Sequence, residues 1–362
     1  MERHRWKNCA IYVGSEAKLE APLKLLLKSI EGKMFPLLEY LGLSASEGSQ
    51  PEDVGLPKFD MPKLTHLRLD ATLTDRSPRK LFANLTQLNI LGAHSTPTVF
   101  LGMLAKASAT LQVLAIACTT FRVDGNPASL APNLEFTLPR LTHVTLRSIS
   151  YGDGGGHRLS IPAIICRAAP SLLDLSLGSL VDSPSYLASK GIILPTVRIL
   201  RCETPSPWTR EGIFAFPGLE MLQADEDATE GLNRAMETDL EAGTGCTAWP
   251  GLKVLVLGDV KESVLIAFVE HRTRVKHPLR TLIMKDDPLS NFSAATLARL
   301  EELKVDVFKR SDGGVAFQIN DDWDNVGSYW DSERDKPILV PWKNSTTFYD
   351  QFDTAYEVCQ SI

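Results

Sequence analysis

A nine-residue phrase recurs along this chain and constrains its fold more than any other feature. WPGLKVLVL (249–257) has close copies in FPLLEYLGL (35–43), MPKLTHLRL (61–69), LPRLTHVTL (138–146) and FPGLEMLQA (216–224). In each copy a bulky apolar residue precedes a proline, and further apolar residues follow in the pattern L-x-x-L-x-L. Such self-similarity at a spacing of tens of residues is typical of repeat proteins, so the chain is expected to fold as a repeat array.

The three apolar positions of L-x-x-L-x-L, called anchors below, recur about twelve times over nearly the whole body of the chain. From Leu38 to Leu300 the first anchors stand 21 to 33 residues apart. The sets are Trp6/Cys9/Ile11, Leu38/Leu41/Leu43, Leu64/Leu67/Leu69, Leu85/Leu88/Ile90, Leu111/Leu114/Ile116, Leu141/Val144/Leu146, Leu172/Leu175/Leu177, Val197/Leu200/Cys202, Leu219/Leu222/Ala224, Leu252/Leu255/Leu257, Leu279/Leu282/Met284 and Leu300/Leu303/Val305.

The alternation within each set predicts the architecture. The second and third anchors are two residues apart, so a short strand places both on one face. One unit alone has nothing to bury that face against, whereas stacked units bury it between them. We therefore predict an α/β solenoid over 1–310, with a curved parallel sheet and outer helices at 96–109, 160–169, 261–271 and 293–302. The alternative is an ordinary α/β protein, whose strands would be longer apolar runs.

The anchor pattern resembles the leucine-rich repeat family. Many members carry asparagine three places after the last anchor, but Ser46, Thr72, Ala93, Thr119 and Ile149 stand there in this chain. Irregular repeat length, no asparagine ladder and a proline before the copies resemble the repeats of fungal, basidiomycete-type F-box proteins. ESVLIAFVEHRTRVKHPLRTLIM (262–284) resembles their last full repeat, and RWKNCAIYV (5–13) resembles the strand that follows the F-box.

This resemblance implies a function in protein recognition. It implies the substrate-recognition half of an F-box-type receptor of a cullin ubiquitin ligase. The F-box itself is a helical segment that usually lies upstream, and here Met1 immediately precedes the first expected strand. A cullin adaptor is therefore expected as a partner only if an F-box is supplied elsewhere. The alternative is a stand-alone leucine-rich-repeat scaffold without any ubiquitin ligase role.

The residues between the anchors are the candidate binding residues, because they line the concave face of a solenoid, where partners bind. Their mixed charge suits a peptide or a protein surface, and the alternative is a solvated strand face that binds nothing. The candidates are His66, Arg68, Asp70, Gln87, Asn89, His143, Thr145, Arg147, Asp174, Arg201, Glu203, Gln223 and Asp225.

Charge and cysteine usage limit the class of protein further. Of 44 acidic and 38 basic residues, ten and three lie in 311–362, which leaves 34 and 35 in 1–310. Neither part has the basic excess that nucleic-acid binding requires. The first residues lack the apolar core of a signal peptide, and no apolar run could span a membrane, so a cytoplasmic or nuclear protein is expected. The six cysteines form no C-x-x-C pair and are expected to be free thiols, most of them buried.

Three other motifs are interpreted as structural. GDGGGH (152–157) lacks the Lys-Ser/Thr pair of a phosphate-binding loop. DDWDNVGSYWDSE (321–333) has acids at some calcium-ligand places but Val326 at another. HRTRVKHPLR (271–280) could bind an acidic partner, but cations at a helix C-terminus also favour the helix dipole. With no G-x-S-x-G or H-E-x-x-H, we expect no enzyme, metal or cofactor; a hydrolase site distant in sequence is the minor alternative.

The acidic segment 311–362 is expected to form a C-terminal cap. It holds nine aromatic residues, more than an acidic disordered tail usually contains. GVAFQI (314–319) could add a last strand, and the later aromatics could cover the exposed end of the array, which needs a cap for solubility. The long segments 44–60, 150–158 and 227–248 are expected to be surface loops.

Overall fold

The computed structural model describes residues 7–13, 34–45, 60–70, 82–92, 94–117, 119–121, 136–151, 160–178, 183–202, 208–224, 249–258, 260–284 and 292–309. The chain divides into two compact units, Met1–Leu172 (unit 1) and Leu173–Ile362 (unit 2). The boundary expected at 310/311, the loop 227–248 and the acidic segment 311–362 lie outside the described residues.

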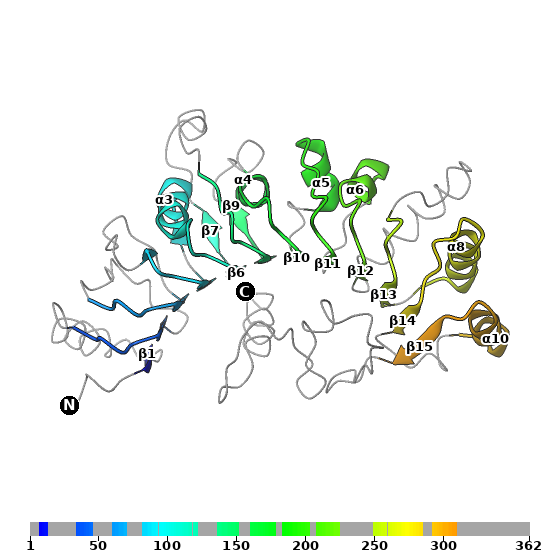
Figure 1. Ribbon diagram of the computed structural model, residues 1–362, viewed down its shortest axis with the longest axis horizontal. Helices are drawn as coiled ribbons and strands as arrows, with labels where there is room; N and C mark the ends of the chain where they lie inside the picture. The colour runs from blue at the N-terminus through cyan, green and yellow to red at the C-terminus, as the bar shows by residue number, and fades with distance from the viewer. Residues whose placement is uncertain are drawn as a thin grey trace. The chain divides into compact units, whose positions relative to one another are not determined.

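Unit 1 contains an open parallel sheet whose strands follow one another in chain order (Figure 1). The second anchors stand opposite one another in its register: Leu41 faces Leu67, then Leu88, Leu114 and Val144. The period-two alternation therefore placed these anchors correctly. The strands are β1 (Asn8–Val13), β2 (Tyr40–Ala45), β3 (His66–Asp70), β4 (Gln87–Leu91), β6 (Val113–Ala117) and β8 (His143–Arg147).

Unit 2 repeats the arrangement, and again each strand pairs in parallel with the next in the chain. Leu200 stands opposite Leu175 and Leu222, and Leu255 stands opposite Leu222 and Leu282. The strands are β10 (Asp174–Gly178), β11 (Ile199–Cys202), β12 (Met221–Ala224), β13 (Val254–Leu257), β14 (Thr281–Met284) and β15 (Asp306–Lys309). The large open parallel sheet that the anchors predict is thus present in an α/β fold.

The recurring proline lies in a turn before the strand. The main-chain N–H of the first anchor donates to the carbonyl of the bulky residue three places earlier: Leu38 to Phe35 at 3.2 Å, Leu219 to Phe216 at 3.2 Å, and Leu252 to Trp249 at 2.9 Å. Proline stands second in each four-residue turn, where its fixed φ suits the turn and its missing N–H is not needed. The motif therefore encodes a turn followed by a strand.

The anchors form the core of both units. Every first anchor from Leu38 to Leu279 is at most 2% exposed, and the bulky residues Phe35, Phe82 and Phe216 are at most 3% exposed. Burial of each leucine contributes roughly 1.5–3 kcal/mol. Cys166 and Cys202 are buried free thiols, as predicted. The side chain of Cys9, together with Cys118, Cys246 and Cys359, lies outside the described residues.

All four predicted helices are present, as α3 (Pro97–Ala107), α4 (Ile161–Ala168), α8 (Glu262–Arg274) and α10 (Ala294–Glu302). Two further short helices were not predicted, α5 (Pro184–Ser189) and α6 (Arg210–Phe214). Figure 1 shows α5, α6, α8 and α10 together on one side of the strands of unit 2.

Side-chain caps explain where most of these helices begin. Ser160 Oγ accepts from Ala163 N at 3.0 Å, and Ser183 Oγ accepts from Tyr186 N at 3.1 Å. Thr96, Thr209 and Ser293 cap α3, α6 and α10 in the same way. Such caps satisfy main-chain donors that have no partner within the helix. The Ser183-Pro184 pair was therefore a local signal for α5.

A second, small parallel sheet in unit 1 was not predicted. It consists of β5 (His94–Ser95), β7 (Thr120–Phe121) and β9 (Ser150–Tyr151). The ring of Phe121 lies between Phe100, at 5.2 Å, and Tyr151, at 6.1 Å between centroids. The expected loop 150–158 therefore begins as a strand, and Ser44 and Ala45 of the expected loop 44–60 belong to β2. The remaining positions are outside the described residues, apart from Asp60, which bridges to Met34.

The last predicted anchor set, Leu300/Leu303/Val305, was wrong. Leu300 lies in α10, and Leu303 is its C-terminal cap residue. The residue opposite Leu282 in the sheet is Val307. Lys304, with φ 59°, turns the chain sharply after α10, so the strand begins only at Asp306.

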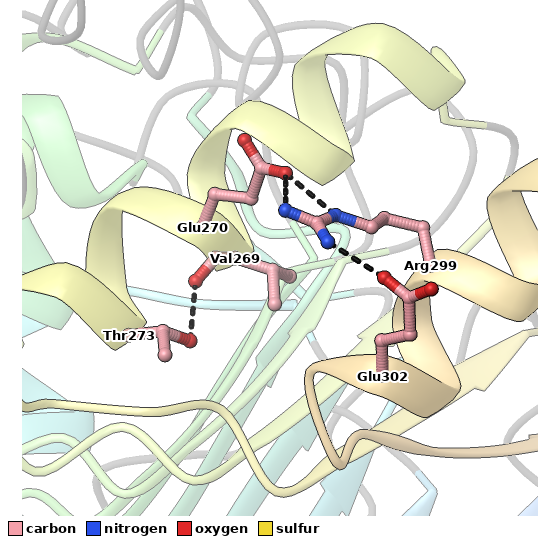
Figure 2. A network of polar contacts seen from close by, with 5 residues as sticks. All are labelled: Val269, Glu270, Thr273, Arg299 and Glu302. Atoms are coloured by element: carbon pink, nitrogen blue, oxygen red, sulfur yellow. Dashed lines mark hydrogen bonds and ion pairs between the residues drawn. The ribbon is translucent and has the colours of Figure 1, made fainter.

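Two polar links join α8 to α10. The Glu262 carboxylate accepts hydrogen bonds from the Ser293 main chain at 3.1 Å and from the hydroxyls of Ser293 and Thr296. These bonds lower the pKa of Glu262. Figure 2 shows the second link, in which Arg299 Nε donates to Glu270 at 2.8 Å and Nη1 donates to Glu302 at 2.6 Å. Adjacent helices of unit 2 are thus tied by hydrogen bonds as well as by packing.

Candidate functional site

The residues between the anchors lie on the opposite face of the sheet from the anchors, because strand side chains alternate. We call this the inter-anchor face of each unit. In unit 1, His66 and Arg68 of β3 stand opposite Gln87 and Asn89 of β4. Four of the predicted site residues are therefore brought together as a two-by-two group on neighbouring strands.

A second polar group in unit 1 lies on β8. His143, Thr145 and Arg147 stand opposite Val113, Ala115 and Ala117 of β6. The strand β6 lies between β4 and β8 in the sheet. Its small apolar residues therefore separate this group from the first. The predicted site residues of unit 1 thus form two polar groups with an apolar strand between them.

The two candidate histidines make the same local contact with the preceding threonine. Thr65 Oγ1 and His66 Nδ1 lie 2.8 Å apart, and Thr142 Oγ1 and His143 Nδ1 also lie 2.8 Å apart. The repeated sequence Leu-Thr-His therefore fixes both imidazole rings through the preceding threonine. Desolvation by burial lowers the pKa of His66, against a smaller opposing effect from the main chain and charge of Glu39. The neutral imidazole is thereby favoured.

Several candidate side chains of unit 1 are less exposed than a solvated strand face would be. Asn89 is 8% exposed, and His143 and Arg147 are each 7% exposed. Asn89 Oδ1 makes no hydrogen bond within the described part of the chain. A buried amide oxygen without a partner is costly, so its position favours contact with a polar donor.

Tyr40 belongs to the same face and was missed. It stands opposite His66 in the sheet register. Its ring lies over Gly42, where an added Cβ would lie 2.5 Å from the Tyr40 hydroxyl oxygen. An aromatic residue between the first and second anchors was the signal available in FPLLEYLGL (35–43).

In unit 2 the candidate residues form a buried polar cluster. Asp174 and Arg201 form an ion pair across β10 and β11, with side chains only 5% and 7% exposed. Ser176 stands opposite Arg201, and Gln223 stands opposite Arg201 on the other side. The side chain of Asp70 and the residues Glu203 and Asp225 lie outside the described residues.

Beside this cluster lies a group of buried aliphatic side chains that was not predicted. Ile199, Met221, Val256 and Ile283 pack together at 2–4% exposure, with Val254 against them. We call these five residues the aliphatic patch. All of them occupy positions between anchors, where polar residues were expected. The signal was present in sequence, since VLVL (254–257) and LIM (282–284) are continuous apolar runs of the kind that strands buried on both faces carry.

The basic segment 271–280 has a structural role within α8. His271, Arg272 and Arg274 lie in the last turn of this helix, as the dipole interpretation expected. Arg272 is fully buried and donates to the carbonyls of Trp249 at 3.2 Å and Leu252 at 2.8 Å. It therefore joins the end of α8 to the turn that precedes β13.

The described residues contain no group of three or more His, Cys, Asp or Glu side chains that could hold a metal ion. The motifs at 152–157 and 321–333 are outside those residues. No helix among the described segments has the length and apolar character needed to cross a bilayer. Comparison with protein-family models and with curated proteins finds no match.

Proposed function

We propose that this protein is a protein-binding module whose partner contacts the inter-anchor face of unit 1. The observation that carries the proposal is the juxtaposition of His66 and Arg68 with Gln87 and Asn89 on neighbouring strands. These side chains offer a cation, two amides and an imidazole. Opposite residues are about 5 Å apart across the sheet, and residues two apart on one strand are about 7 Å apart. Such a mixed polar surface suits a peptide main chain or a protein surface with acidic and amide groups.

The more specific proposal is that the chain is a leucine-rich-repeat solenoid and the substrate-recognition part of an F-box-type receptor of a cullin ubiquitin ligase. Two features support it: the open parallel sheet with a recurring turn-and-strand unit, and the resemblance of 5–13 and 262–284 to repeats of fungal F-box proteins. In this proposal an F-box is supplied by another segment or chain, and the complex acts in the cytoplasm or the nucleus. The chain itself has no catalytic role, cofactor or nucleic-acid partner.

The alternative is a stand-alone scaffold that binds the same class of partner without a ligase. Affinity purification of the tagged protein from its native locus, with a proteasome inhibitor, separates the two. Recovery of a cullin and its adaptor supports the receptor. Recovery of other proteins without any ligase component supports the scaffold.

A pair of charge-reversal variants tests the proposed surface itself. Arg68→Glu changes the inter-anchor face of β3, whereas Arg140→Glu makes the same change in an exposed turn of unit 1. We expect Arg68→Glu to weaken capture of the specific partners by about tenfold or more, and Arg140→Glu to leave it unchanged. Equal capture by both variants would show that partners bind elsewhere.

A further inference from the structure

Three helices of unit 2, α5, α8 and α10, end in the same left-handed turn. In each turn a main-chain N–H beyond the helix donates to the carbonyl five residues earlier: Ile192 to Leu187 at 3.1 Å, His277 to Arg272 at 2.9 Å, and Val305 to Leu300 at 3.0 Å. The residue just before this donor has a positive φ, which glycine adopts most easily because it has no side chain. After α5 that residue is Gly191, with φ 68°.

Lysine occupies the same position after α8 and α10. Lys276 has φ 64° and Lys304 has φ 59°, a backbone conformation that residues with a Cβ rarely adopt. The negative end of the helix dipole favours a cation here, but a cation inside the last turn gains the same interaction without the left-handed backbone, as Arg274 does in α8. Backbone conformation therefore does not explain why both turns carry lysine.

The two lysines belong to a set of exposed cations at the ends of α8 and α10. We call Arg274, Lys276, Arg280 and Lys304 the basic turn cluster, and all four are exposed. The main-chain N–H of Asp306 donates to the carbonyl of Arg280 at 2.9 Å, so the turn that carries Lys304 lies beside the one that carries Arg280. The cluster therefore extends over two consecutive repeats.

The charges of the basic turn cluster are not neutralised within the described part of the chain. None of its four cations forms an ion pair there. Residues 271–284 contain no acid, and Arg299 already holds Glu270 and Glu302 of the adjoining helices (Figure 2). Of the described acids in 270–309, this leaves only Glu301 and Asp306 beside the four cations.

We propose that the basic turn cluster binds an acidic segment of a partner protein. Arginine and lysine side chains pair with carboxylates, and exposed cations that lack partners attract such groups at long range. The net charge of −6 disfavours an extended polyanion such as nucleic acid or an anionic membrane, which would meet the field of the whole chain. A short acidic segment meets only the local field, because salt screens charges beyond about 8 Å.

This surface is independent of the one proposed in unit 1. Its partner contacts turns at the ends of helices, whereas the partner of unit 1 contacts strand residues between the anchors. Arg68→Glu should therefore leave binding at the basic turn cluster unchanged, whether or not it weakens binding at unit 1.

Binding of an acidic probe to the full chain tests the proposal. The probe is a fluorescein-labelled decapeptide of alternating glutamate and serine, and fluorescence anisotropy measures its affinity. We expect saturable binding, which Lys276→Gln with Lys304→Gln weakens by about tenfold. The matched control is Lys63→Gln with Arg140→Gln, which removes two exposed cations from turns of unit 1 and should leave the affinity unchanged. Absence of saturable binding, or an equal loss in both double variants, would overturn the proposal.

Glycine variants separate binding from a structural role of the lysines. Lys276→Gly with Lys304→Gly removes both charges and suits the left-handed backbone, so the melting temperature should not fall while the affinity falls by about tenfold. Wild-type affinity in this variant would refute the proposal. Vesicles of phosphatidylserine and phosphatidylcholine and a single-stranded DNA are measured alongside, and tighter binding of either than of the peptide would assign the cluster to a different partner.

Discussion

The buried side chain of Arg272 links α8 to the turn before β13. It is the largest side chain that is fully buried among the described residues, and its guanidinium also lies 5.6 Å from the ring of Phe268. Its two donors meet the main-chain carbonyls of Trp249 and Leu252 in the turn before β13. A planar fork of donors suits two neighbouring carbonyls in a way that an ammonium does not.

Replacing Arg272 should therefore be strongly destabilising. We expect Arg272→Ala to lower the free energy of unfolding by about 3 kcal/mol, because two charge-assisted hydrogen bonds are lost and a cavity forms. Arg274→Ala removes an exposed arginine from the same helical turn and should change it by less than about 0.5 kcal/mol. Denaturant unfolding measures both values, and equal values would contradict the role assigned to Arg272.

His66 should make stability depend on pH. Its pKa in the folded chain is lowered below the ordinary value of 6.5, so the unfolded chain binds more protons than the folded chain between those two pKa values. The contribution is fully present above pH 6.5 and is lost as the pH falls toward the lowered pKa. The charge of Glu39 opposes the shift of the His66 pKa.

The test is a series of unfolding measurements across this range of pH. In the wild type the free energy of unfolding should fall as the pH drops below 6.5, and His66→Gln should make that fall smaller. A variant that keeps the full slope would assign the pH dependence to other groups.

Among the elements, the turn before each strand depends on very close packing. Gly218 lies in the turn before β12, and a Cβ at this position would overlap the carbonyl oxygen of Pro195 in the preceding turn. Stacked turns can approach this closely only where one of them lacks a side chain.

Two glycine-to-alanine changes should therefore act in opposite directions. Gly218→Ala should lower the free energy of unfolding by about 2 kcal/mol through overlap with a main-chain atom. Gly102→Ala lies within α3 with nothing near the added methyl group, so helix propensity should raise the free energy of unfolding by about 1 kcal/mol. Thermal melting of the two variants gives the comparison, and a stabilised Gly218→Ala variant would refute the packing argument.

At the scale of the whole molecule, the described strands of the large sheet in each unit pair in chain order, so destabilisation should be local. Leu114 is fully buried and lies on β6 between β4 and β8. Leu114→Ala should cost about 3 kcal/mol, and hydrogen exchange should rise most in β4, β6 and β8. Exchange in β12–β14 should change little. A uniform rise in every strand would mean that the chain unfolds as one cooperative unit instead.

The anchors, the turns and four helices could be predicted from sequence because each depends on local rules. Leu41 and Leu67 share a face because strand side chains alternate, and Pro217 suits its turn because its φ is fixed. The strands β5, β7 and β9 have two residues each, too few to produce a periodic pattern. The shift of the second anchor from Leu303 to Val307 depends on the left-handed residue Lys304, which follows the C-terminal cap residue of α10.

The candidate site shows the same contrast between what local sequence rules predict and what residues distant in sequence determine. The alternation of anchors is enough to place His66, Arg68, Gln87 and Asn89 on one face, since side-chain direction in a strand is a local property. Which of these positions become buried depends on neighbours that are distant in sequence. Ile199 and Ile283 meet in one patch only because β12 and β13 lie between them in register, and Asp174 meets Arg201 only across paired strands. Strand pairing therefore determines where polar side chains gather on this face and where aliphatic side chains do.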